Sequence, residues 1–317
     1  MGRAPRGKQS FLSGRLPGPW LYVLNRSAIP LFPLRVAHAV ARPWGDFAYA
    51  AWGSKARTAR RNYASILGTT PDDPRVDRLA RRCFQHFSLY MAEMIDVQGW
   101  DTETVLDSLA IEGEQHFVEA EAHGKGIIFV SGHMGSAEIA ASIVLLRGYK
   151  VTSVIDGRYP RFVSEWIRAC RKRMGVTLLP ASRSGMSLVR KLRQREMVAL
   201  VIDAGVSGGD GIPVNFFGRR TVFPAGPARL ARLSGSPIVF GVAVRRPGGR
   251  PEPGTSRRFH VYVEPAILSD RALSGEEDTQ RITQQIASTF ERYVRRYPDQ
   301  WYVFRDMWPH LAPVTND

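Results

Sequence analysis

The stretch Ile127-Ile128-Phe129-Val130-Ser131-Gly132-His133-Met134-Gly135-Ser136-Ala137-Glu138 indicates both the fold and a place where chemistry could occur. Its first four residues form a continuous apolar run, as in a strand that is buried on both faces. Glycines then flank a histidine, and a helical pattern follows. The stretch therefore predicts a strand, a tight turn and a helix, which is the unit from which parallel α/β sheets are built.

The same alternation continues along the chain. We expect strands at 126–131, 150–155, 176–179, 197–203, 237–244 and 258–264. We expect helices at 135–147, 160–173, 184–195, 225–234 and 277–297, after a mainly helical region at 56–110. These elements predict an α/β fold with a central, mostly parallel sheet flanked by helices.

Positive charge is concentrated at the start of the chain. The 317 residues carry a net charge of +15, and residues 1–61 hold eleven basic residues against one acidic residue. Large apolar side chains lie between these charges, but no uncharged window reaches the roughly 18–20 residues that a spanning helix needs. A secretory signal also fits poorly, because no small-residue cleavage site follows the short apolar run.

We therefore expect residues 1–62 to form basic amphipathic helices that associate with an anionic membrane surface, and 63–317 to form the α/β domain. A pair of helices packed on the domain with a solvated basic face would give the same pattern. Nucleic acid is not an expected partner, because no recognition helix, zinc module or RNA-binding aromatic pattern is present.

Cysteine and histidine spacing argues against a metal or a disulfide framework. Cys83 and Cys170 stand alone, which is typical of a reducing compartment. The six histidines other than His133 show no ligand spacing. We expect no metal and no cofactor.

His133 follows a strand, and ligands collect at the carboxyl ends of the strands in open α/β sheets. Glu138 falls in the first turns of the next helix, where it could fold back and accept a hydrogen bond from Nδ1 of His133. Such a pair would leave Nε2 as a general base for a hydroxyl group. A histidine that caps or packs near a helix start is the structural alternative.

A second group of residues follows the strand at 197–203, which Asp203 ends. The glycine-rich segment 205–218 would let the backbone approach a ligand, and its Phe216 and Phe217 could line a channel for a hydrocarbon chain. The turn around Gly226 feeds a helix whose free N–H groups suit a phosphate or an oxyanion. Ordinary connecting loops remain the alternative for both.

One motif points to a different enzyme class. Gly205-Val206-Ser207-Gly208-Gly209 matches the G-x-S-x-G elbow of serine hydrolases, in which Ser207 would be the nucleophile. That elbow opens a helix at once, and the glycines and Pro213 that follow oppose one here. We therefore favour a flexible loop.

Three blocks together resemble a known family. The H-x4-E of His133 and Glu138, the segment Gly211–Gly218 (GIPVNFFG) and the segment Phe223–Ala231 (FPAGPARLA) resemble the bacterial lipid A late acyltransferases and the phosphatidylinositol mannoside acyltransferases, a branch of the glycerolipid acyltransferase superfamily. The likeness extends from Arg61-Asn62 to the tail Pro298-Asp299-Gln300-Trp301, and so covers nearly the whole chain.

The resemblance implies an enzyme on the cytoplasmic face of the bacterial inner membrane. It would move a fatty acyl chain from acyl-CoA or acyl carrier protein to a hydroxyl of a membrane glycolipid or lysolipid, with His133 as base and Glu138 as its orienting carboxylate. Arg158 corresponds to a family arginine that binds negatively charged groups. The acceptor identity and the acyl length stay open.

The chain departs from the wider pattern at two places. The family's Asp-Gln pair appears as Asp203-Ala204, so a contact from the glutamine amide cannot be carried over. The third block lacks the acceptor-binding glutamate of the superfamily at Ala225, and Asp210 is the nearest acid to the FFG loop. A serine hydrolase that uses Ser207 and a catalytically silent lipid-binding adaptor remain the competing hypotheses.

Overall fold

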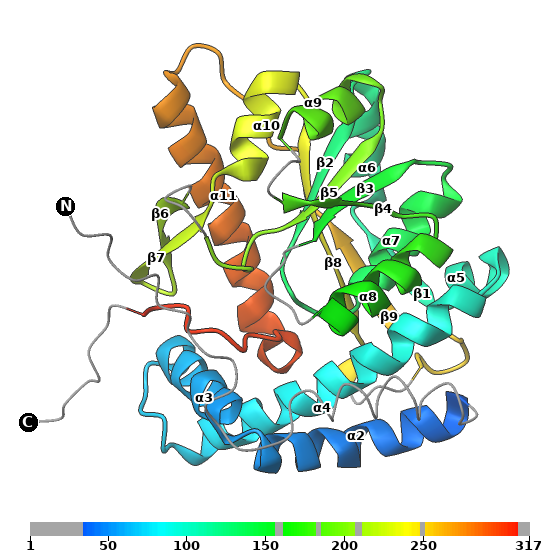
Figure 1. The fold of residues 1–317 in the computed structure, drawn as a ribbon, viewed down its shortest axis with the longest axis vertical. Helices are drawn as coiled ribbons and strands as arrows, with labels where there is room; N and C mark the ends of the chain where they lie inside the picture. Colours follow the sequence, from blue (N-terminus) through cyan, green and yellow to red (C-terminus); the bar gives the residue numbers. More distant parts are fainter. Residues whose placement is uncertain (1–33, 156–160, 182–184, 207–210, 248–250, 310–317) are drawn as a thin grey trace, which may run out of the picture.

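A seven-stranded sheet forms the centre of the protein (Figure 1). The computed structural model describes residues 34–155, 161–181, 185–206, 211–247 and 251–309. The strands of the sheet are β1 (Leu109–Glu112), β2 (Ile127–Ser131), β3 (Val151–Ile155), β4 (Thr177–Pro180), β5 (Met197–Val201), β8 (Ile238–Arg245) and β9 (Phe259–Val263). Their order is β1-β9-β8-β2-β5-β3-β4, and every neighbouring pair is parallel except β8 and β9. The predicted mostly parallel α/β sheet is confirmed.

Helices cover both faces of this sheet (Figure 1). On one face lie α5 (Thr102–Asp107), α6 (Glu114–Ala122), α7 (Ala137–Leu146) and α8 (Arg161–Arg173), and on the other α9 (Gly185–Arg193), α10 (Gly226–Ser234) and α11 (Gly275–Arg296). Ile128 and Val130 of β2 pack under α9, α10 and α11, whereas Ile127 and Phe129 pack under α6 and α7. Because both faces are buried, the strand is apolar at every position rather than at every second one.

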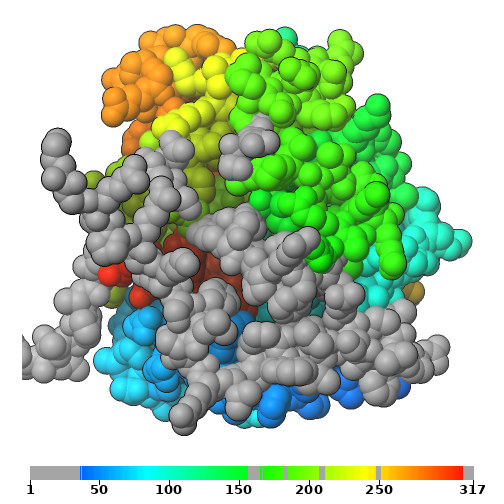
Figure 2. Space-filling model, in the orientation of Figure 1, coloured from blue at the N-terminus to red at the C-terminus, as the bar shows by residue number. Residues whose placement is uncertain are grey.

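A third group of helices closes one end of the sheet. It consists of α2 (Leu34–Ala51), α3 (Gly53–Leu67) and α4 (Pro74–Asp96), which pack on one another and on Tyr302 and Phe304 near the C-terminus. In the space-filling view these helices, blue to cyan, lie along the lower edge beneath the red C-terminal part of the chain (Figure 2). A buried ion pair between Arg245 of β8 and Glu93 of α4 fastens this layer to the sheet.

The expected division into amphipathic helices over 1–62 and an α/β domain over 63–317 stays a prediction. Of the expected helices over 1–62, residues 1–33 lie outside the described residues. The boundary expected at residue 62 falls inside α3. A membrane-associating role for this region stays a prediction.

Two segments differ from the expected elements. The helical region expected to run to residue 110 gives way at residue 109 to β1, which pairs with β9 at the edge of the sheet. The expected loop is wrong over residues 211–218, because β6 (Gly211–Phe216) and β7 (Arg219–Pro224) form an antiparallel hairpin. Phe217 and Gly218 connect the two strands with φ of 55° and 70°, as in the tight turns that favour positive φ at both positions.

Glycine is required in the turn that follows β2. Gly135 has φ of 60°, and a Cβ atom there would lie 1.8 Å from the carbonyl oxygen of Ala243 in β8. A Cβ atom at Gly132 would lie 2.2 Å from the ring of Phe290. The turn that carries His133 is therefore pressed against the sheet and α11, and it has no room to relax.

We predict that Gly135→Ala lowers the free energy of unfolding by about 4 kcal/mol or more, because the new methyl group meets strand backbone that cannot move aside. Gly148→Ala is the matched control, since Gly148 has φ of 81° and nothing within 4 Å of an added Cβ. This control should cost only about 1–2 kcal/mol, the intrinsic cost of a left-handed conformation. Urea unfolding followed by tryptophan fluorescence measures both, and equal losses would contradict the prediction.

Candidate active site

His133 and Asp203 meet because β2 and β5 are parallel neighbours in register. Ser131 at the end of β2 lies beside Val201 at the end of β5. Each of the two side chains comes two residues later, so both emerge at the carboxyl edge of the sheet. His133 Nδ1 lies 2.7 Å from Asp203 Oδ1, and the imidazole remains 37% exposed. His133 thus lies at the carboxyl edge of the sheet, with the buried Asp203 carboxylate behind its partly exposed imidazole.

The Asp203 carboxylate accepts hydrogen bonds from both sides. The backbone N–H of His133 donates to both oxygens at 3.0 Å, and the indole Nε1 of Trp301 donates to Oδ2 at 2.9 Å. Burial opposes the charged form, but the neighbouring His133 and these donors hold the pKa of Asp203 below its ordinary value. An ionised carboxylate only accepts hydrogen bonds, so Nδ1 of His133 carries the proton and Nε2 is left with a free lone pair.

The C-terminal segment 300–305 supports this pair. Tyr302 donates its backbone N–H to the carbonyl of His133 at 2.8 Å and its phenol to the carbonyl of Gly135 at 2.9 Å. Arg305 Nε donates to the backbone carbonyl of Asp203 at 2.7 Å. The tail therefore touches both halves of the pair, although they stand 70 residues apart in sequence.

The prediction that Glu138 accepts from Nδ1 of His133 is wrong, because Asp203 occupies that place. Glu138 lies in the first turn of α7, is 2% exposed, and accepts from Arg171 Nε and Nη2 at 3.2 Å. Burial, together with the negative charge of Glu138, raises the pKa of the Tyr90 phenol. Glu138 thus sits among α4, α7 and α8. A catalytic role for Glu138 stays a prediction.

The remaining predicted site residues lie as follows. Phe216 and Phe217 are buried, and the ring of Phe216 packs on Phe290 and Trp301. Gly226 is the first residue of α10, which packs on α9, α11 and β2. Arg158, Ser207 and Asp210 lie outside the described residues. Substrate binding stays a prediction for all six residues to which the sequence assigns it, namely Arg158, Asp203, Asp210, Phe216, Phe217 and Gly226.

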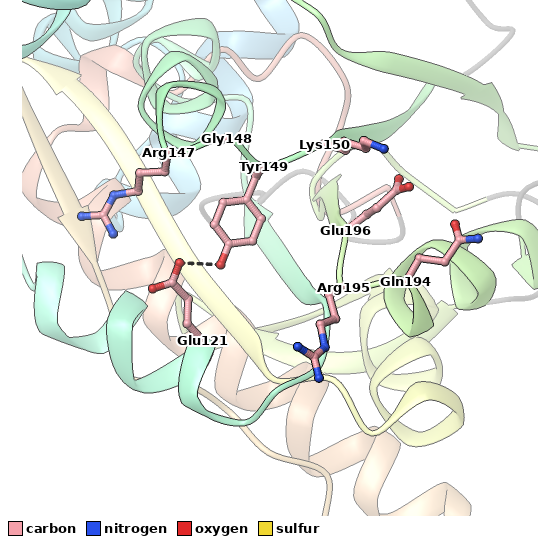
Figure 3. A pocket seen from close by; sticks show the side chains of 8 residues that line it. All are labelled: Glu121, Arg147, Gly148, Tyr149, Lys150, Gln194, Arg195 and Glu196. Atoms are coloured by element: carbon pink, nitrogen blue, oxygen red, sulfur yellow. Dashed lines mark hydrogen bonds between the residues drawn. The ribbon is translucent and has the colours of Figure 1, made fainter.

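An open hollow lies at the other end of the sheet (Figure 3). Lys150 and Glu196 precede β3 and β5, so the hollow is at the amino ends of these strands, whereas His133 follows the carboxyl end of β2. Tyr149 donates to Glu121 inside it, and the charged groups of Arg147, Lys150 and Arg195 point in different directions. This hollow does not belong to the His133 site.

The described part of the chain offers no cluster of metal ligands. Within it, no three histidine, cysteine, aspartate or glutamate side chains are grouped as metal ligands would be. Cys83 and Cys170 are buried, free thiols, and burial raises the pKa of both.

Comparison with known proteins assigns this chain to a family. Residues 4–310 match the family model for bacterial lipid A biosynthesis acyltransferases, and the chain belongs to that family. It is therefore an acyltransferase.

The chain is also similar to two curated proteins that share one name. The chain is 25% identical to the phosphatidylinositol mannoside acyltransferase of Mycolicibacterium smegmatis over 274 residues, which cover 85% of this chain and 84% of the relative. It is 26% identical to the protein of the same name from Mycobacterium tuberculosis over 263 residues, which cover 81% and 78%. The resemblance stated from the motifs is confirmed.

Proposed function

We propose that this acyltransferase moves a fatty acyl chain from a thioester, acyl-CoA or acyl carrier protein, to a hydroxyl group of a membrane glycolipid, with His133 as the general base. The observation that carries the proposal is the contact between His133 Nδ1 and the buried Asp203 carboxylate in a chain of an acyltransferase family. Asp203 replaces Glu138 as the group that orients the imidazole.

The pair supplies what the transfer requires. Nε2 of His133 takes the proton of the acceptor hydroxyl as the hydroxyl oxygen attacks the thioester carbonyl carbon. An ester C–O bond forms, the C–S bond breaks, and the proton passes from Nε2 to the departing sulfur to give a free thiol. Asp203 stabilises the imidazolium that exists between the two proton transfers. Because the thioester is already activated, no covalent nucleophile is needed.

The proposed class of acceptor rests on the names of the relatives and of the family, and not on a pocket in the structure. Two relatives are named for acylation of phosphatidylinositol mannosides, and the family for lipid A biosynthesis. Both are glycolipids with sugar hydroxyls. We propose an acceptor of this class, with a mannosylated phosphoinositide placed before a lipid A precursor on the strength of the relatives.

The outer side of α2 suits a membrane surface. Val36, Val40 and Phe47 are 38%, 50% and 53% exposed, and their spacing of four and seven residues places them on one side of the helix. Arg57 and Arg61 are exposed on the adjoining α3. Exposed apolar side chains on one side of a helix are typical of helices that lie in the headgroup region of a bilayer, and cations elsewhere in the same helical layer would add attraction to anionic lipids.

Among the described helices, none has the length and apolar character needed to cross a bilayer. We propose peripheral binding to the cytoplasmic face of the inner membrane, where soluble thioester donors can meet a lipid acceptor.

Loss of the base should abolish transfer. We predict that purified protein releases free thiol from palmitoyl-CoA only when a glycolipid fraction is added, and that His133→Ala lowers the rate by at least about 10³-fold, since general base catalysis and positioning are lost together. Ser207→Ala is the discriminating variant. Release that survives His133→Ala and fails in Ser207→Ala would favour the hydrolase, and no release from either CoA or carrier-protein donors would refute the transfer.

Removal of an apolar contact should weaken membrane binding. We predict that Phe47→Asp binds phosphatidylglycerol vesicles roughly tenfold more weakly than the parent protein, about 1.4 kcal/mol, in a sedimentation assay. Leu233→Asp is the control, because Leu233 is 61% exposed on α10, outside the helical layer that contains α2. Equal binding by all three proteins would exclude α2 as the contact surface.

A further inference from the structure

We propose that Trp301 is a positioning residue for the reaction, because its indole N–H fixes the carboxylate that orients His133. The inference rests on the proposed function and extends it to a side chain that need not touch either substrate. Trp301 Nε1 donates to Asp203 Oδ2 at 2.9 Å, while Oδ1 of the same carboxylate serves the imidazole at 2.7 Å. Both oxygens also accept from the backbone N–H of His133, but only Oδ1 contacts the imidazole and only Oδ2 contacts the indole.

The division between the oxygens controls the orientation of the carboxylate. Without the indole, the carboxylate would be held only by His133, through its imidazole and through a backbone N–H shared by both oxygens, and these contacts leave it freer to rotate about its Cβ–Cγ bond. The indole N–H on Oδ2 opposes that rotation, and groups that hold a histidine's carboxylate partner in this way set both its direction and its basicity. Asp203 is 4% exposed, so a direct protein donor takes the place that water would otherwise fill.

Trp301 is itself firmly held. It is fully buried, and its ring packs edge-on against Phe216 and Phe290, with centroids 5.8 and 6.0 Å apart. Its backbone carbonyl accepts from the phenol of Tyr63 at 2.9 Å and from the thiol of Cys83 at 3.3 Å. An isolated β-bridge joins it to Met134, the neighbour of His133. The indole thus has one position relative to the turn that carries the base.

Trp308 provides a matched control within the same core. It is 4% exposed, and its ring stacks on the ring of Phe216, with centroids 6.0 Å apart and planes at 22°. In the described part of the chain, no hydrogen-bond acceptor lies within reach of its Nε1. Changing either tryptophan to phenylalanine removes the same atoms from a buried aromatic cluster, but only Trp301→Phe removes a donor from Asp203.

The direction of the expected shift in the pH–rate profile follows from the charge on the Asp203 carboxylate. A carboxylate that loses a donor keeps more of its negative charge for the imidazolium, so the base holds its proton up to higher pH. Among the described residues, His133 from the turn after β2 contacts the carboxylate of Asp203, and Arg305 from the C-terminal segment contacts its backbone carbonyl. Both are unchanged in the two variants. The acid limb of the pH–rate profile should therefore move to higher pH in Trp301→Phe alone.

The experiment compares the parent protein, Trp301→Phe and Trp308→Phe in thermal unfolding, in kcat over a range of pH, and in an NMR titration of the ¹³C-labelled His133 ring. We expect both variants to lose a few degrees of Tm. Trp301→Phe should lower kcat by roughly 10- to 100-fold, change KM little, and move the acid limb and the His133 titration to higher pH. Trp308→Phe should leave kcat, the acid limb and the His133 titration near the parent values.

Equal kcat and equal His133 titration in the two variants would overturn the proposal and leave Trp301 a packing residue. If Trp301→Phe does not fold, β-(3-benzothienyl)alanine at position 301 keeps the shape of the side chain and replaces the N–H by sulfur, and the same shift is expected. A parent protein that transfers no acyl group would refute the proposed function, whereas the His133 titration would still decide the role of Trp301.

Discussion

The buried carboxylate of Asp203 is the contact on which the rest of the site depends. It joins three parts of the chain, namely the turn after β2, the end of β5 and the C-terminal segment 300–305. A buried carboxylate without donors would be strongly unfavourable, so each of these segments must be in place for the others to be stable there. The requirement couples folding of the C-terminal segment to the position of His133.

Most of the sheet could be predicted from sequence, because its strands are buried on both faces and so appear as short apolar runs between helical segments. Six of the seven strands lie within one or two residues of the expected ranges. The exception, β1, is a four-residue edge strand directly after α5 and has no distinct pattern of its own. The hairpin at 211–224 was also missed, since its glycines and Pro213 favour a loop unless α11 is present to pack against.

The site could be predicted only in part, for a physical reason. The position of His133 could be predicted, because the residue stands between two glycines in a turn directly after an apolar strand. The H-x4-E spacing suggests that Glu138 meets the imidazole, but the left-handed Gly135 turns the chain before α7 begins, and Glu138 meets Arg171 instead. Asp203 becomes visible only when β2 and β5 are known to be neighbours in register. The contacts of Trp301 and Tyr302 with the site become visible only when the three-dimensional course of the C-terminal segment is known.

We propose that Asp203, and not Glu138, orients His133 as the general base, and a comparison of Asp203→Asn with Glu138→Gln tests this proposal most directly. Acyl transfer should be measured from pH 5 to 9 on the folded fraction of each. We expect Asp203→Asn to lower kcat by roughly 10³- to 10⁴-fold, since an amide favours the wrong imidazole tautomer. Glu138→Gln should lower Tm through the Arg171 ion pair and keep the parent pH dependence. Retained turnover in Asp203→Asn, with its loss in folded Glu138→Gln, would contradict the account.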